Sequence, residues 1–162
     1  PVTGHKRGAD IGGPLSTSTG RERLAGYRSA LMASGKAIEP ALIKTGWYKR
    51  ESGHQLATEL LAGDDRPDAI FAGNSLIAQG VLDAISEKGM RVPHEVAVVS
   101  FDDITGANSY APFLTAVIQP AYEIGRIGTR LLLEQISGAR EETEEMILPT
   151  QLVIRRSCGC TP

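Results

Sequence analysis

Val96-Ala97-Val98-Val99-Ser100-Phe101 is an apolar run of the length of one strand, and Asp102-Asp103 follows it directly. β-branched residues fit a pleated sheet better than a helix, so the run predicts a strand. Residues 76–88 are predicted as a helix that starts after a capping Asn74 or Ser75 and ends at Gly89. A helix that leads into such a strand is typical of β-α units around a parallel sheet, which indicates the α/β class.

The same alternation of short apolar runs and amphipathic stretches extends along the whole chain. Thr19 and Glu22 form a Thr-x-x-Glu pattern that predicts the start of the first helix. Residues 69–73 are apolar throughout, which predicts a strand buried on both faces. The predicted strands are residues 9–14, 41–46, 69–73, 96–101, 115–118 and, at an edge, 146–154, and the predicted helices are residues 19–34, 50–62, 76–88 and 120–136.

The composition is that of a soluble globular domain. The 162 residues are 41% hydrophobic and 22% charged, with a formal net charge of -2, so the chain lacks the basic footprint of a nucleic-acid or membrane-surface binder. No apolar run approaches the roughly 20 residues of a membrane helix. The first residues carry neither an initiator Met nor the apolar segment of a signal peptide, and we expect the chain to be a piece of a longer protein.

The sequence shows no sign of catalysis or metal binding. It has no Gly-x-Ser-x-Gly, Walker or Gly-x-Gly-x-x-Gly motif, and none of His5, His54 and His94 adjoins an obvious nucleophile. Cys158 and Cys160 are too few for a zinc site unless histidines converge on them. We expect these thiols to lie in a frayed tail of a protein from a reducing compartment. No catalytic residue, metal or cofactor is therefore predicted.

Polar and aromatic side chains follow each of the first five predicted strands, or begin the helix after it. In an open parallel sheet, ligands bind beyond the carboxyl ends of the strands. Hydroxyls, a guanidinium, an amide and a carboxylate bind hydroxyl groups, and an aromatic ring covers the apolar face of a sugar or a base. We therefore expect one cleft for a small hydroxyl-bearing molecule, lined by Thr17, Thr19, Arg23, Tyr48, Asn74, Asp102 and Gln119.

Each of these side chains also has a purely structural explanation. Thr17, Thr19 and Asn74 could be helix caps, which for Thr19 is the favoured explanation. Asp102-Asp103 could be an Asx turn, and Arg23 could pair with Glu22 or Glu39. Either aromatic of Trp47-Tyr48 could stack on a ligand, with Trp47 favoured for structural packing. Convergence at one edge of the sheet is what favours a binding site.

Six stretches in register resemble the effector domain of the LacI/GalR family of transcriptional regulators, from about residue 4 to residue 156. The stretches are Gly4-His5-Lys6-Arg7 with Ile11-Gly12-Gly13-Pro14, Arg21-Glu22-Arg23-Leu24-Ala25-Gly26-Tyr27, Ser52-Gly53, Arg66-Pro67-Asp68-Ala69-Ile70-Phe71-Ala72-Gly73-Asn74, residues 89–103 from Gly89-Met90-Arg91-Val92-Pro93 to Asp102-Asp103, and Leu114-Thr115-Ala116-Val117-Ile118-Gln119-Pro120.

The resemblance implies a type I periplasmic-binding-protein-like fold with two lobes. It makes this chain a three-layer αβα lobe with a parallel sheet, lacking most of the N-terminal lobe. About residues 5–118 and 140–157 would form the C-terminal lobe. The helix at about residues 120–137 would belong to the missing N-terminal lobe.

The resemblance also implies a function. The chain would be the effector-binding and dimerisation domain of a cytoplasmic LacI-type regulator, usually a repressor, and would not be an enzyme. Its partners would be a sugar, polyol or nucleoside effector, a second copy of itself, and operator DNA through a helix-turn-helix that this chain lacks. The alternative is the solute-binding protein of a sugar ABC transporter, which shares the fold.

Site residues carry over by position. Arg23, Asp102 and Asn74 match the family's polar effector contacts, and Tyr48 matches the aromatic that stacks on the ligand. Thr17, Thr19 and Gln119 match residues that line the cleft, and Gln79 and Leu82 lie on the helix that dimerises in the family, although for Leu82 a place in the core is favoured. The chain departs from the family pattern at two positions. Asp10 replaces an apolar strand residue, which lowers stability unless its carboxyl group is paired. Ser75 stands where the family often has Asp.

Overall fold

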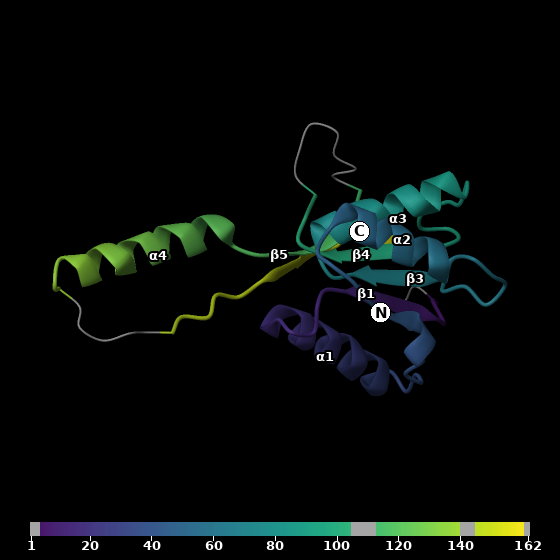
Figure 1. The fold of residues 1–162 in the computed structure, drawn as a ribbon, viewed down its shortest axis with the longest axis horizontal. Helices are drawn as coiled ribbons and strands as arrows, with labels where there is room; N and C mark the ends of the chain where they lie inside the picture. Colours follow the sequence, from purple (N-terminus) through teal and green to yellow (C-terminus); the bar gives the residue numbers. More distant parts are fainter. Residues whose placement is uncertain (1–3, 105–112, 140–144, 161–162) are drawn as a thin grey trace.

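A computed structural model describes residues 4–104, 113–139 and 145–160, so most of the long loop after Asp103 and residues 140–144 lie outside the described part. The described part confirms the α/β class and the alternation of elements (Figure 1). Six strands form one sheet in the order β2-β1-β3-β4-β5-β6. The strands are β1 Gly8–Gly12, β2 Ile43–Thr45, β3 Ala69–Ala72, β4 Ala97–Phe101, β5 Thr115–Ile118 and β6 Gln151–Val153, and the helices are α1 Ser18–Ala33, α2 Arg50–Leu60, α3 Ser75–Glu87 and α4 Ala121–Ile136, with short 3₁₀ turns at Pro40–Leu42 and Arg156–Cys158.

The sheet is parallel from β2 through β5, and β6 pairs with β5 in the antiparallel direction. The last strand is thus at an edge, as predicted. Figure 1 shows α1 on one face of the sheet and α2 with α3 on the other. The main core lies under α2 and α3, where Ile11, Ile70 and Val98 are buried. These are the three layers expected of such a lobe.

Two details of the prediction are wrong. The first helix is capped by Thr17, whose Oγ1 accepts a hydrogen bond from Gly20 N at 3.1 Å, so Thr19 and Glu22 do not form a capping box. Strand β3 is buried on only one face, because Phe71 points toward the α1 side and is only partly covered. Within the described residues, α1 is the one helix on that side, and it lies beside β1.

Helices α2 and α3 pack closely because glycine faces backbone where they cross. A Cβ on Gly80 of α3 would overlap the carbonyl oxygen of Arg50 and the amide nitrogen of His54. A Cβ on Gly53 of α2 would overlap the backbone of Ile77. The two helices can therefore meet backbone to backbone only with glycine at these positions.

Asp10 is buried in the middle of β1, where it is 2% exposed. Its Oδ1 has no hydrogen-bond partner among the described residues. Burial raises the pKa of Asp10 to about 7, while the positive charge of Arg28 opposes the rise. Burying this carboxyl group therefore lowers the stability of the folded chain, as expected for an acidic residue in this strand.

The C-terminal segment is not frayed, which corrects the expectation for the tail. Ser157 is fully buried, and its Oγ accepts a hydrogen bond from Thr115 N at 2.7 Å and donates one to the Val98 carbonyl at 2.6 Å. This hydroxyl ties the tail to β4 and β5. Cys158 is also buried, at 8% exposure.

Replacing Ser157 with alanine is expected to lower the free energy of unfolding by about 2 kcal/mol, because a buried amide and a buried carbonyl each lose a hydrogen bond. Urea unfolding followed by circular dichroism measures the change. Ser137→Ala is the matched control, since among the described residues that hydroxyl bonds only the Glu134 carbonyl, at an exposed helix end. Equal losses in the two variants would contradict the role of Ser157.

Helix α4 lies away from the sheet, joined to it through β5 and the segment that leads into β6 (Figure 1). None of its described residues is buried. Its exposed apolar side chains include Tyr122 at 79% and Ile136 at 73%. An amphipathic helix in water stabilises itself by burying its apolar face, so α4 has a face with no partner in the described residues.

Candidate functional site

The predicted site residues gather at the carboxyl end of the parallel sheet. Thr17 and Thr19 follow β1, Tyr48 follows β2 and Asn74 follows β3. Asp102 and Gln119 follow β4 and β5, and Arg23 reaches this edge from α1. The strand order β2-β1-β3-β4-β5 makes their loops neighbours. Hydrogen bonds and ring contacts connect Thr17, Thr19, Tyr48 and Arg23 in one group and Asp102 with Gln119 in another.

Two of the seven residues have the capping role that was the alternative explanation. Thr17 caps α1, and its hydroxyl also donates to the Pro14 carbonyl at 2.8 Å. Asn74 caps α3 by accepting a hydrogen bond from Ile77 N at 2.8 Å with its Oδ1. The Thr17 hydroxyl thus both donates and accepts a hydrogen bond within its own loop and helix. Capping uses only the side-chain oxygen of Asn74, so the NH₂ group of this amide can still donate hydrogen bonds.

Arg23 is the centre of the first group. Its Nη1 donates to the Gly73 carbonyl at 2.6 Å, and its guanidinium carbon lies 3.8 Å from the ring centroid of Phe101 and 5.8 Å from that of Tyr48. The alternative explanation of Arg23 as the ion-pair partner of Glu39 does not hold, because Glu39 pairs with Arg7 at 2.6 Å. One carbonyl and two aromatic faces hold the guanidinium in place, and its other N–H groups can still bind a ligand.

Tyr48 connects the loops after β1 and β2. Its hydroxyl lies 3.3 Å from Thr19 Oγ1. Its ring covers Gly13 so closely that a Cβ at that position would overlap it. Trp47 is 69% exposed, so the expectation that Trp47 is the structural aromatic of the pair is wrong. Tyr48 packs within the site, and Trp47 faces solvent.

Asp102 and Gln119 form the second group. Gln119 Nε2 donates to Asp102 Oδ1 at 2.6 Å. Asp102 has a φ of 65°, in the left-handed region that a non-glycine residue adopts at a cost. The Oδ1 of Asp103 accepts a hydrogen bond from Ile104 N at 2.9 Å, which is one residue on rather than the two residues of an Asx turn. Asp102 is thus held in an unusual conformation with its carboxylate hydrogen-bonded to the neighbouring loop.

A cleft of about 760 Å³ opens beside these groups, between α1 and the sheet. Among the predicted residues, Thr19, Arg23 and Gln119 line it, whereas Thr17, Tyr48, Asn74 and Asp102 border the same loops outside its lining. The floor is apolar and includes Phe71, Phe101 and Val117. The cleft therefore combines polar groups at the strand ends with an apolar surface.

The sequence argument missed three members of this arrangement. They are the Phe101 ring under Arg23, the Gly73 carbonyl that fixes the guanidinium, and Gly13 under the Tyr48 ring. Only Phe101 carried a usable signal, because alternation along β4 places it on the face opposite Val98. The Gly73 carbonyl could not be predicted from the sequence, because every residue has a backbone carbonyl whatever its side chain.

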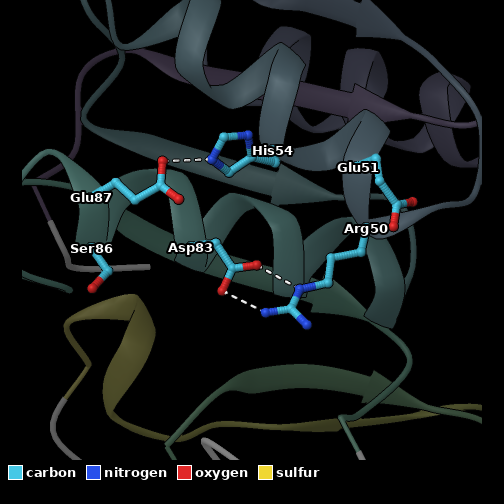
Figure 2. A pocket seen from close by; sticks show the side chains of 6 residues that line it. All are labelled: Arg50, Glu51, His54, Asp83, Ser86 and Glu87. Carbon is cyan, nitrogen blue, oxygen red and sulfur yellow. Dashed lines mark hydrogen bonds and ion pairs between the residues drawn. The ribbon is translucent and has the colours of Figure 1, made fainter.

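A second hollow, of about 520 Å³, lies on the outer surface of α2 and α3 (Figure 2). Arg50 forms a paired contact with Asp83, at 2.6 and 3.0 Å, and His54 Nε2 lies 2.7 Å from Glu87 Oε2. Figure 2 shows Arg50 and His54 of α2 pointing toward Asp83 and Glu87 of α3, with dashed lines between the paired groups. Exposed pairs of this kind are typical of a solvated helix surface.

In the part of the chain that the structure describes, no three or more histidine, cysteine or acidic side chains are arranged to hold a metal ion. No described helix has the length and apolar character needed to cross a bilayer.

The chain is similar in sequence to known protein domains over nearly its whole length. The model of the periplasmic binding protein-like domain matches residues 2–158. The transcriptional regulator CelR of Thermobifida fusca is 40% identical over 96% of this chain and 46% of its own length. The helix-turn-helix-type transcriptional repressor PurR of Klebsiella pneumoniae is 33% identical over 98% of this chain and 47% of its own length. The chain thus spans about half the length of the curated relatives it matches.

Solved structures agree with the sequence relatives. A CelR–cellobiose complex superposes with a TM-score of 0.86 at 39% identity, covering 96% of this chain and 47% of that one. The lac repressor dimer bound to operator and the anti-inducer ONPF gives 0.81 at 32% identity, covering 96% and 53%. Because sequence and fold both agree over 96% of this chain, the similarity is closer than that of two proteins that share only an architecture. The chain therefore belongs to the periplasmic binding protein-like family, among the effector-binding domains of LacI-family transcriptional regulators.

Proposed function

We propose that this chain binds a small hydroxyl-bearing effector, a sugar or a related polyol or nucleoside, for a bacterial transcriptional regulator, usually a repressor. The observation that carries the proposal is the immobilised Arg23 at the mouth of the cleft, between the loops of Asn74 and Asp102. The proposed contacts are Thr17, Thr19, Arg23, Tyr48, Asn74, Asp102 and Gln119. The fixed guanidinium binds ligand oxygens with little further loss of conformational freedom.

The groups at the strand ends suit this ligand class. The remaining N–H groups of Arg23 and the NH₂ of Asn74 donate to ligand oxygens, and the free oxygen of Asp102 accepts from ligand hydroxyls. The cellobiose in the related CelR complex is a ligand of that class. An aromatic floor next to polar groups is the usual make-up of such a site.

The proposal includes a second lobe. The relatives are about twice as long as this chain, and α4 has an apolar face without a described partner. We assign residues 5–118 and 140–157 to one lobe and α4 to the other. Binding between two lobes that move relative to each other gives the two-state element a regulator needs.

The same proposal names the macromolecular partners. A second copy would bind through α3, on which Gln79 is partly exposed and Leu76 is 43% exposed, while Leu82 and Ile85 belong to the core as favoured. Operator DNA would be bound by a helix-turn-helix outside this chain, in the cytoplasm, and the chain itself would not be an enzyme. Sedimentation of the full-length protein tests the dimer.

Regulator relatives favour this function over the solute-binding protein of a sugar transporter, which shares the fold. CelR and PurR both carry the description of helix-turn-helix regulators. A solute-binding protein would bind sugar without any effect on DNA. Effector-dependent operator binding by the full-length protein therefore distinguishes the two functions.

In the full-length protein, Arg23→Ala and Asp102→Ala are each expected to weaken effector affinity about 100-fold and to leave operator binding intact, because each removes a charged hydrogen-bonding group from the site. Operator release measured by fluorescence anisotropy during effector titration tests this. The control is Arg21→Ala on the same helix, whose side chain bonds only the exposed Leu15 and Ser16 carbonyls. A normal response in both site variants would remove these residues from the site.

A further inference from the structure

The two cysteines at the C-terminal end form a compact pair. Cys158 ends a 3₁₀ turn, and Gly159 follows in the left-handed conformation with a φ of 75°. That turn brings Cys160 back, so that its backbone N–H donates to Cys158 Sγ at 3.4 Å. Cys158 Sγ in turn donates to the Arg155 carbonyl at 3.3 Å. The backbone of Cys160 is thus folded back onto the Cys158 sulfur, on a segment anchored by the fully buried Ser157.

A histidine completes the surroundings of this pair. His5 Nε2 is buried and has no hydrogen-bond partner among the described residues. The same nitrogen lies 3.5 Å from the position that a Cβ on Gly159 would occupy. His5 thus places an imidazole nitrogen without a partner next to Gly159, the residue between the two cysteines, and a neutral imidazole is able to accept a proton from a thiol.

The chemistry of the pair points to oxidation rather than to metal binding. The described residues hold no cluster of three metal-ligating side chains, and zinc sites need three or four protein ligands. Burial opposes ionisation of Cys158, but hydrogen bonds from Thr115 and Cys160 lower its pKa, whereas contact with Cys158 raises the pKa of Cys160. A more acidic thiol beside a second thiol is the arrangement of a reactive and a resolving cysteine.

We propose that Cys158 and Cys160 form a reversible intramolecular disulfide when they meet a peroxide. The Cys158 thiolate attacks one peroxide oxygen, so that an S–O bond forms, the O–O bond breaks, and hydroxide leaves to become water. The Cys160 sulfur then attacks Cys158 sulfur, so that the S–S bond forms, the S–O bond breaks, and a second hydroxide leaves with the Cys160 proton as water. The two thiols lose two electrons to the peroxide, and an external dithiol returns them.

This site is separate from the effector cleft. His5 precedes β1 and the cysteines follow β6, whereas the cleft lies between α1 and the sheet, and neither His5 nor the cysteines line it. A disulfide has no S–H donor, so the hydrogen bond from Cys158 to the Arg155 carbonyl is lost on oxidation. The Arg155 side chain is bound to Asp103 at 2.7 and 2.9 Å, next to Asp102. Oxidation therefore changes a contact that is linked to the effector loop.

The test uses the reduced 162-residue chain treated with stoichiometric hydrogen peroxide, followed by alkylation and peptide mass mapping. We expect the C-terminal peptide to lose two hydrogen masses, to resist alkylation at both sulfurs, and to recover after dithiothreitol. Cys160→Ser is expected to retain one added oxygen on Cys158, which a sulfenic-acid reagent traps. His5→Gln is expected to slow oxidation roughly tenfold if the imidazole accepts the thiol proton.

Three results would overturn the proposal. One is full alkylation of both cysteines after peroxide, and another is a disulfide only between two copies on a non-reducing gel. The third is oxidation at the same rate in urea-unfolded chain, because the folded arrangement would then contribute nothing. Effector binding is not measured in this test, so its outcome does not depend on the proposed function.

Discussion

Replacing Asp10 with valine is expected to raise the free energy of unfolding by about 4 kcal/mol above about pH 7. The folded protein buries this carboxyl group without a partner for Oδ1, and burial raises its pKa to about 7. The unfolded chain has the ordinary value of about 3.9. The difference between the two values, at about 1.4 kcal/mol per unit, gives this magnitude.

The gain depends on pH in a defined direction. Because the folded-state pKa is raised, the folded protein binds the proton more tightly than the unfolded chain does. The stability contributed by protonated Asp10 is complete below about pH 3.9 and is lost as the pH rises through about 7. The advantage of Asp10→Val or Asp10→Asn over the parent chain therefore grows between these two values and is constant above them.

Urea unfolding of parent and variant across this pH range measures the difference directly and cancels the titration of other groups. Asp103→Asn is the control of opposite sign. The hydrogen bonds from Arg155 lower the pKa of Asp103, so the stability that its charge contributes is present above its ordinary pKa and is lost as the pH falls. An Asp10 variant whose advantage did not change with pH would show that this carboxyl group is not buried as described.

Gly80→Ala is expected to lower the free energy of unfolding by about 3 kcal/mol, although alanine is the better helix former. The added methyl group would overlap the backbone of Arg50 and His54, and backbone cannot move aside as a side chain can. Helices α2 and α3 would have to separate, which opens the core that they cover.

Gly26→Ala is the matched control, in the middle of α1. Nothing lies within 4 Å of the position that its Cβ would occupy, so the substitution should stabilise the chain by about 0.5 to 1 kcal/mol through helix propensity alone. Thermal unfolding of both variants tests the pair. A neutral Gly80→Ala variant would contradict the close approach of the two helices.

The order and type of the elements could be predicted because they depend on local periodicity. Every predicted strand and helix has a counterpart, and Thr115–Ile118 has the predicted bounds. The predictions were wrong where tertiary packing, rather than local sequence, determines the role of a residue. Thr17 rather than Thr19 caps α1 because its side chain also reaches the Pro14 carbonyl, and Phe71 is only partly covered because α1 lies over the neighbouring part of the sheet.

The sequence by itself determined the α/β class, the parallel arrangement and the edge of the sheet at which polar residues gather, because chain order and strand polarity place these loops together. Only the tertiary structure decided what each residue does there. It fixed Arg23 on the Gly73 carbonyl and the Phe101 ring, left Trp47 in solvent, and brought His5 next to Gly159. These contacts join residues far apart in the chain, and several of them use backbone atoms, which residue identity does not encode.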